Sequence, residues 1–258
     1  MSDLKKSEIL GYHSFAEDSN WNGSYENFLE RTTSGKSSRY LIFLLDIIKF
    51  KNGKLLDFAA GTCWTSYIFA EKNFDVTALE MNPSDLCGLG IFRKYRNKMP
   101  FKAILGDCEN SPLKEGVFDV VFCHQALHHA TDLDRMVSEM ARCAKKGGFV
   151  IAGGEHIRPF YSSDEAFRKK HPAVAFGANE HAYPYYRYRS AFRSAGITKV
   201  KVIPRGFECD FETISQKPVR ALIKCILKIP IIGEGIVRSA LLYFSGAGTE
   251  ITIYGYKS

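Results

Sequence analysis

Acidic side chains and small residues stand where successive apolar segments of the sequence end. The first segment ends in DFAAGTC, residues 57–63, and the second ends in Glu80. Small residues in a turn let a ligand approach the backbone closely. Glu80 lies 19 residues after Gly61, a spacing at which an acidic side chain can accept hydrogen bonds from ribose hydroxyls. Asp107, after the third segment, can accept from an adenine amine, so the pattern predicts a site for a nucleoside-containing cofactor.

Histidines follow the later segments, and an imidazole near neutral pKa suits the removal of a proton from a hydroxyl. The candidates for a general base are His129, His156 and His181. The spacing of His124, His128 and His129 would also place two of them on one side of a helix, as metal ligation requires. No carboxylate or cysteine completes a ligand set there, so we expect no metal.

Strand-like and helix-like runs alternate from residue 54 to residue 155. We predict strands over 54–60, 75–80, 101–107, 117–124 and 149–155, and helices over 65–72, 83–95 and 132–146. A helix over 36–50 precedes them, and a helix over 185–196, a strand over 197–204, two helices within 215–245 and a strand over 250–257 follow. The alternation predicts an α/β fold with a parallel sheet covered on both faces. Ligands bind such sheets at the carboxyl ends of the strands.

Two stretches outside this alternation are predicted to handle the acceptor. Residues 1–35 are polar but rich in aromatic side chains, and we interpret them as an N-terminal lid segment ahead of a domain over 36–258. Residues 156–185 interrupt the alternation and form an acceptor-loop insertion, and a helical insertion covers about 207–248. The predicted acceptor-binding residues are Glu155, Glu180, Tyr183, Trp21 and Tyr25.

A dinucleotide is the competing cofactor. The glycine spacing of a dinucleotide-binding turn, counted from Ala59, would place Trp64 at the third glycine, where an indole blocks close approach of the helix. S-adenosylmethionine has no pyrophosphate and tolerates this side chain. The sequence has no GxSxG, HExxH or P-loop motif, which argues against a hydrolase or NTPase.

Four motifs resemble the class I S-adenosylmethionine-dependent methyltransferases of the methyltransferase type 11 kind. They are LLDFAAGTC, ALEMNP, LGDCENSPLKEGVFDVVFCHQALHHATD and KKGGFVIAG, in that family's order and spacing. The resemblance covers residues 40–155 well. It implies a Rossmann-like, seven-stranded, mostly parallel sheet whose last strand is antiparallel, and S-adenosylmethionine as cofactor.

The resemblance also implies roles for individual residues. Asp57 would orient the methionine amino group, and the backbone of Ala59, Gly61 and Cys63 would line the methionine moiety. Glu80 would bind the ribose, and the other predicted contacts are Met81 on adenine, Asp107 and Cys108 at the adenine edge, and His124 and Gln125 near the sulfonium. Only one of the family's three glycines, Gly61, is kept, so bulk is added beside the cofactor.

The acceptor is predicted less directly. Bacterial relatives with a similar insertion resemble modifiers of sugars or surface glycans, so we expect a small-molecule or glycan-type acceptor methylated at oxygen. The alternatives are an N-methyltransferase of a small amine and a catalytically weak, methyltransferase-like binding or partner subunit. An NAD-dependent oxidoreductase ranks below them because of Trp64.

Composition and charge set the remaining expectations. The 258 residues carry a net charge of +7, and the seven cysteines form no CxxC pair, which favours a reducing, cytoplasmic location without a signal peptide. The sequence lacks the pattern of a basic groove with stacking aromatic side chains, so we expect no nucleic-acid partner. A basic, amphipathic helix over 217–228 could contact an anionic membrane surface.

Overall fold

A computed structural model describes residues 2–21, 24–33, 35–204, 225–226, 233–244 and 248–258. Its centre is a seven-stranded sheet with the order β3-β2-β1-β4-β5-β7-β6. The strands are β1 (Gly53–Phe58), β2 (Phe74–Glu80), β3 (Lys102–Leu105), β4 (Phe118–His124), β5 (Ala144–Ile157), β6 (Ile197–Pro204) and β7 (Thr249–Lys257). Neighbours among β1–β5 pair in parallel, whereas β7 runs antiparallel to β5 and β6. The predicted fold class is confirmed.

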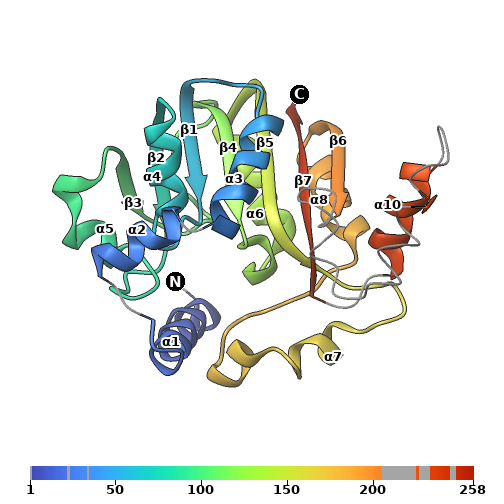
Figure 1. The fold of residues 1–258 in the computed structure, drawn as a ribbon, viewed down its shortest axis with the longest axis horizontal. Helices are drawn as coiled ribbons and strands as arrows, with labels where there is room; N and C mark the ends of the chain where they lie inside the picture. Colours follow the sequence, from blue (N-terminus) through green and yellow to red (C-terminus); the bar gives the residue numbers. More distant parts are fainter. Residues whose placement is uncertain (1, 22–23, 34, 205–224, 227–232, 245–247) are drawn as a thin grey trace.

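Helices cover both faces of this sheet (Figure 1). The described α-helices are α1 (Asp3–Asp18), α2 (Tyr25–Thr33), α3 (Gly35–Ile47), α4 (Trp64–Glu71), α5 (Gly90–Lys94), α6 (Leu133–Cys143), α7 (Asp164–Arg168), α8 (Tyr185–Ser194) and α10 (Gly233–Phe244). The described 3-10 helices are η1 (Arg96–Lys98), η2 (Leu127–His129) and η3 (Pro172–Phe176).

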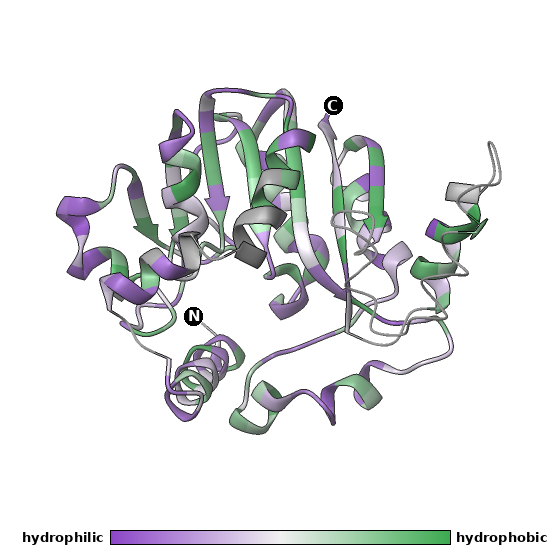
Figure 2. Ribbon diagram, in the orientation of Figure 1, coloured by the Kyte–Doolittle hydropathy of each residue, from purple (hydrophilic) through white to green (hydrophobic). Residues whose placement is uncertain are grey.

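Strand β4 shows why the central strands are apolar along their whole length. Val121 and Cys123 pack into a core with α6 and α8, whereas Val120 and Phe122 pack into a second core with α3 and α4. Successive side chains of a strand point to opposite faces, so a strand covered on both faces has no solvent-facing position. Figure 2 shows this as hydrophobic colour along the central strands.

The carboxyl ends of the parallel strands meet at one edge of the sheet. In Figure 1 the arrow of β1 points toward this edge, and α1 lies across it, with α7 further along. The fold therefore gathers the residues that follow β1, β2, β3 and β4 beneath an N-terminal helix.

Two predicted helices are shorter than the sequence pattern suggested. Of the helix predicted over 83–95, only α5 forms, because the side chains of Asn82 and Ser84 accept the backbone N–H groups of Ser84 and Leu86 and hold a turn. The helix predicted to reach residue 146 ends at Cys143, because Ala144 already pairs with Phe118 in the sheet. The predicted lid segment contains two helices, α1 and α2.

Most of the predicted helical insertion over 207–248 lies outside the described residues, apart from α10 and residues 225–226. The predicted basic helix over 217–228 lies outside them too, except at those two positions. Among the helices that the structure does describe, none has the length and apolarity needed to span a bilayer.

Removing one aromatic ring tests the packing between β4 and α4. Phe122 is fully buried, and its ring centroid lies 4.8 Å from that of Phe69. Phe122→Ala is expected to lower the free energy of unfolding by about 3–5 kcal/mol, because the cavity cannot collapse fully. Urea denaturation measures this, with Phe160→Ala as control, since the Phe160 side chain is 58% exposed and should change stability by less than about 0.5 kcal/mol. Equal effects of the two substitutions would contradict the assigned packing.

Candidate active site

The turn after β1 keeps an unusual backbone path without the expected glycines. Ala59, Gly61 and Cys63 have φ angles of 58°, 53° and 63°, a left-handed region that costs a non-glycine residue about 1–2 kcal/mol. The Cys63 side chain is fully buried, packed in a core cluster that includes Ala78 and Leu89. The bulk of Cys63 therefore lies in the core, and the turn remains open to a ligand at Gly61.

Asp57 at the end of β1 is a buried carboxylate held by two hydroxyls. Thr65 Oγ1 and Ser66 Oγ, both on α4, donate to Asp57 Oδ2 at 2.6 and 2.5 Å. Burial raises the pKa of Asp57 to about 6, although the two hydroxyl donors act in the opposite direction. Both hydroxyls bind Oδ2, so Oδ1 takes neither of these side-chain donors and is the oxygen that could meet a cationic group in the pocket.

Glu80 at the end of β2 joins two loops. Gly61 N donates to Glu80 Oε2 and Asn82 N donates to Glu80 Oε1, each at 2.7 Å. Burial raises the pKa of Glu80, and the backbone donors oppose this shift. The side chain is thus oriented by the loops that flank the pocket.

Residues after β3 pair with the N-terminal helix. Lys5 Nζ of α1 lies 2.7 Å from Asp107 Oδ1 and 2.9 Å from Glu109 Oε2. Burial opposes charge on Lys5, yet the hydrogen bonds with Asp107 and Glu109 raise its pKa. Both oxygens of Asp107 are 2.7 Å from the ammonium group, so the predicted adenine contact of Asp107 is occupied by Lys5 in this arrangement.

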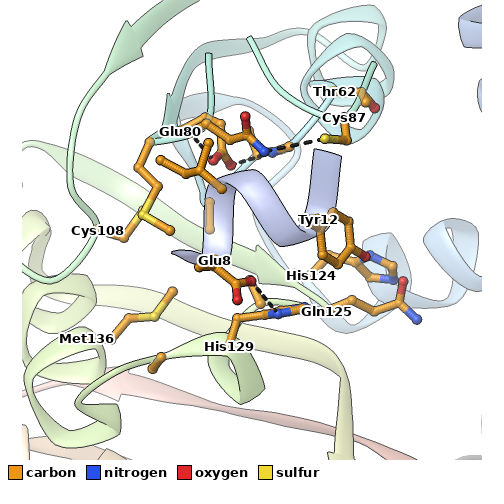
Figure 3. Close-up of a pocket in the computed structure, with 18 of the residues that line it drawn as sticks. Glu8, Tyr12, Thr62, Glu80, Cys87, Cys108, His124, Gln125, His129 and Met136 are labelled. Carbon is orange, nitrogen blue, oxygen red and sulfur yellow. Dashed lines mark hydrogen bonds and ion pairs between the residues drawn. The ribbon is translucent and has the colours of Figure 1, made fainter. Parts of the chain in front are cut away.

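A second contact of α1 lies one helical turn further on. Glu8 Oε1 is 3.0 Å from His129 Nδ1, and Glu8 Oε2 accepts from the backbone N–H of Asn179. Burial disfavours charge on His129, but the carboxylates of Glu180 and Glu8 raise its pKa to about 9. Figure 3 shows Glu8 pointing from α1 to His129, and the ring of Tyr12 meets that of His129 edge-on, with the centroids 5.4 Å apart.

These segments enclose a pocket that contains most of the predicted cofactor residues. Of those, the pocket is lined by Asp57, Ala59, Gly61, Glu80, Met81, Asp107, Cys108, His124 and Gln125. His129 and Trp21 also line it. The structure therefore brings together residues that are far apart in the sequence, from Trp21 to His129.

Other predicted residues lie away from this pocket. His156 packs against the rings of His128 and Phe167, at centroid distances of 4.3 and 5.6 Å. His181 is held by Asp164 and Asn179, at 2.7 and 3.1 Å. Neither ring lines the pocket described above, so the structure does not bring these two histidines to it, and their role as a general base stays a prediction.

Of the predicted acceptor residues, Trp21 lines the pocket and the other four do not. Glu155 and Glu180 are 0% and 2% exposed and contact histidines behind the pocket wall. The ring of Tyr183 packs on His181 and Tyr188, and burial raises its pKa to about 12. Tyr25 of α2 packs on Tyr95 and Phe28, beneath Lys98. These polar residues therefore lie behind the wall of the pocket and do not line it.

Sequence reasoning missed the pocket residues of α1. They are Lys5, Glu8, Ile9 and Tyr12. Their spacing of three and four residues places them on one face of a helix, and this signal was present in the sequence. The aromatic content of the segment suggested a lid, whereas its helical period identifies the face that meets the pocket.

Comparison with known proteins identifies the domain. Residues 56–152 match the family model described as a methyltransferase domain. The demethylmenaquinone methyltransferase of Paenarthrobacter aurescens is 30% identical over 159 residues, which are 58% of this chain and 60% of that protein. The malonyl-[acyl-carrier protein] O-methyltransferase of Buchnera aphidicola is 27% identical over 127 residues, or 49% of each chain. The chain thus spans about half to three fifths of these relatives.

Solved structures agree on the fold. The phosphoethanolamine N-methyltransferase 2 of Haemonchus contortus, in complex with S-adenosyl-L-methionine, superimposes with a TM-score of 0.60 at 18% identity, covering 85% of this chain and 52% of that one. The resemblance found in the sequence is therefore confirmed at the level of the domain: residues 56–152 match a methyltransferase domain, and the fold is shared with a solved structure that binds S-adenosyl-L-methionine.

The pKa of Asp57 predicts how the stability of the ligand-free protein depends on pH. The folded-state pKa of about 6 is above the ordinary value of 3.8, so folding favours the protonated carboxyl. The stabilising contribution of Asp57 to the free energy of unfolding is fully present below pH 4 and is lost as the pH rises toward 6. Asp57→Asn cannot ionise, so its stability relative to the unmodified protein should rise by roughly 3 kcal/mol between pH 4 and pH 7.

Urea denaturation of both proteins at several pH values measures this difference. Asp75→Asn is the matched control, because Asp75 is an exposed residue of β2. A pH-independent difference between Asp57→Asn and the unmodified protein would contradict the burial assigned to Asp57.

Proposed function

We propose that this protein transfers a methyl group from S-adenosylmethionine to an oxygen of a small-molecule acceptor. The observation that carries the proposal is the pocket that α1 covers, in which Asp57, Gly61 and Glu80 line the cofactor half and His129 lines the other side. Bound there, the cofactor supplies an electrophilic methyl on a sulfonium. The protein supplies orientation and an environment of fixed charge.

The residues of the cofactor half suit this ligand. Asp57 Oδ1 would accept from the methionine ammonium, and the carboxylate of Glu80 would accept from the ribose hydroxyls with its remaining lone pairs. Met81 and Cys108 supply apolar and sulfur surface for the adenine. The left-handed backbone at Ala59 and Cys63 supports cofactor binding, because the turn follows the path that glycines would allow.

Helix α1 would act as the predicted lid. Lys5 holds both oxygens of Asp107 at 2.7 Å, so an adenine amine that uses Asp107 must share or displace this ion pair. Cofactor entry is therefore expected to shift α1 and to loosen its contact with the loop after β3.

The acceptor side of the pocket favours an acceptor oxygen that loses its proton without a general base. His129 lies with Nδ1 3.0 Å from Glu8 Oε1 and with Nε2 3.7 Å from Glu180 Oε1. Both ring nitrogens face carboxylates, so neither is free to take a proton from the acceptor. A carboxylic acid or an acidic hydroxyl fits this wall better than a sugar hydroxyl, which would require a base.

Two other candidates follow from the sequence. An amine acceptor needs only a neutral lone pair, and a non-catalytic partner subunit would use the same fold without binding the cofactor. The open turn at Gly61 favours binding. Calorimetry with S-adenosylmethionine tests the partner-subunit hypothesis, because such a subunit would give no binding heat. Identification of the methylated atom in the product distinguishes an oxygen acceptor from an amine.

Substitution of Glu80 tests the cofactor half. Glu80→Ala is expected to raise the dissociation constant of S-adenosylmethionine roughly 10- to 150-fold, because the ribose loses a charged acceptor worth about 1.5–3 kcal/mol. Isothermal titration calorimetry gives the constant, and a thermal melt checks that the variant is folded. Glu71→Ala at the exposed end of α4 is the control. Unchanged affinity in folded Glu80→Ala would remove Glu80 from the cofactor site.

A further inference from the structure

A cluster of histidines and carboxylates lies behind the pocket wall, and the proposed methyl transfer leaves most of it unused. Its centre is formed by His128 and His129 of η2 and by Glu180, which precedes α8. The His128 side chain is 2% exposed and that of Glu180 is 3% exposed. Burying charge and hydrogen-bonding capacity in this way is unfavourable unless each group has a partner.

The outer carboxylates fix where the ring nitrogens point. Glu155 Oε2 lies 2.8 Å from His128 Nδ1, and it also accepts the backbone N–H of the same residue at 3.1 Å. With Nδ1–H donating to Glu155, Nε2 of His128 carries a lone pair. This Nε2 faces Glu180 Oε2 at 3.6 Å. Two acceptor atoms thus face one another in a buried site.

The second ring repeats the arrangement. Glu8 Oε1 lies 3.0 Å from His129 Nδ1, and His129 Nε2 faces Glu180 Oε1 at 3.7 Å. Each histidine therefore has one nitrogen beside an outer carboxylate, with hydrogen-bond geometry at His128 and at 3.0 Å without it at His129, and the other nitrogen directed at Glu180. A carboxylate that binds the far nitrogen of a histidine is the usual outer partner of a metal-bound imidazole.

The separations suit metal ligands better than hydrogen bonds. At 3.6 and 3.7 Å the nitrogen and oxygen atoms are too far apart to share a proton. Two ligands that each bind one ion at about 2.0–2.2 Å are separated by roughly 3.4 Å in tetrahedral geometry. The three donor atoms all lie within 4.8 Å of one another. A single ion can satisfy contacts that one proton cannot.

Glu180 also has an oxygen without a hydrogen-bond partner. Its Oε2 is buried and accepts from no donor in the described part of the chain. The ion pairs of Glu8, Glu155 and Glu180 within that part are all with histidines. Lysine and arginine therefore provide no ion pair to this cluster among the described residues. A protonated His129 can offset one of the three negative charges, whereas a divalent cation would offset two.

We propose that His128, His129 and Glu180 bind a divalent transition-metal ion of the zinc class. Two imidazoles and one carboxylate form a ligand set typical of such ions and leave coordination positions for water. The sequence alone predicted no metal, because no carboxylate lies near the histidines along the chain. Glu180 supplies it from the acceptor loop, 51 residues after His129.

The position of the site defines its effect. His129 lines the pocket, Glu180 belongs to the acceptor loop, and Glu8 belongs to α1. An ion here would fasten the acceptor loop to η2 and hold His129 in place at the pocket wall. The inference does not depend on methyl transfer, since metal binding is measured without cofactor or acceptor.

Metal content and titration test the site. Full-length protein without a histidine tag is treated with chelator, dialysed, and titrated with Zn²⁺ by calorimetry, and bound metal is counted by mass spectrometry. We expect about one tightly bound ion per chain in the unmodified protein. Glu180→Gln should lose this ion, and Glu155→Gln should bind it roughly 10- to 100-fold more weakly, as expected when an outer carboxylate is removed.

A matched control and a second readout make the test specific to this cluster. His13→Asn should bind normally, because His13 of α1 contacts Ser84 and Glu17 outside the cluster. Co²⁺ bound to the unmodified protein should show ligand-field bands without thiolate charge transfer, and this readout needs no variant to fold. Absence of a stoichiometric ion, a thiolate band with Co²⁺, or unchanged binding in folded Glu180→Gln would each overturn the proposal. Calorimetry with S-adenosylmethionine on the same samples tests the methyltransferase function separately.

Discussion

The carboxylate of Glu80 receives backbone N–H groups from two loops, Gly61 after β1 and Asn82 after β2, each at 2.7 Å. Parallel pairing of β1 with β2 brings these loops to the same edge of the sheet, and the carboxylate then fixes their separation. The left-handed turn from Ala59 to Cys63 depends on this tie, because its strained residues require support from their surroundings. The pocket exists where these constraints meet.

Helix α1 couples the two halves of that pocket through charge. Lys5 pairs with Asp107 and Glu109 on the cofactor side, whereas Glu8 reaches His129 on the other side. These contacts are largely buried, so breaking one of them leaves a charge with an unmet desolvation cost. A ligand that replaces the Lys5 contact with Asp107 would therefore also change the position of Glu8 and the environment of His129.

Local pattern in the sequence was sufficient for the sheet and for bringing the residues of the proposed cofactor half to one pocket. Apolar runs of strand length located β1, β2, β4 and β5, and the end of each strand placed Asp57, Glu80 and His124 at one edge. Contacts between residues far apart in the chain could not be predicted from local sequence pattern. The packing of His156 on His128 and Phe167 and the pairing of Glu180 with η2 depend on the path of the acceptor loop, and no spacing in the sequence encodes that path. Helix α1 is intermediate, because its helical period is visible but its partner surface is not.

A crystal structure of the full chain with S-adenosylhomocysteine tests the central claim most directly. We expect the ribose hydroxyls to lie within hydrogen-bond distance of Glu80, the methionine amino group to face Asp57, and the ion pair between Lys5 and Asp107 to be lengthened or rearranged. Product cofactor bound elsewhere, or bound at this edge of the sheet without a contact to Glu80 or Asp57, would contradict the assignment of this pocket as the methyltransferase site.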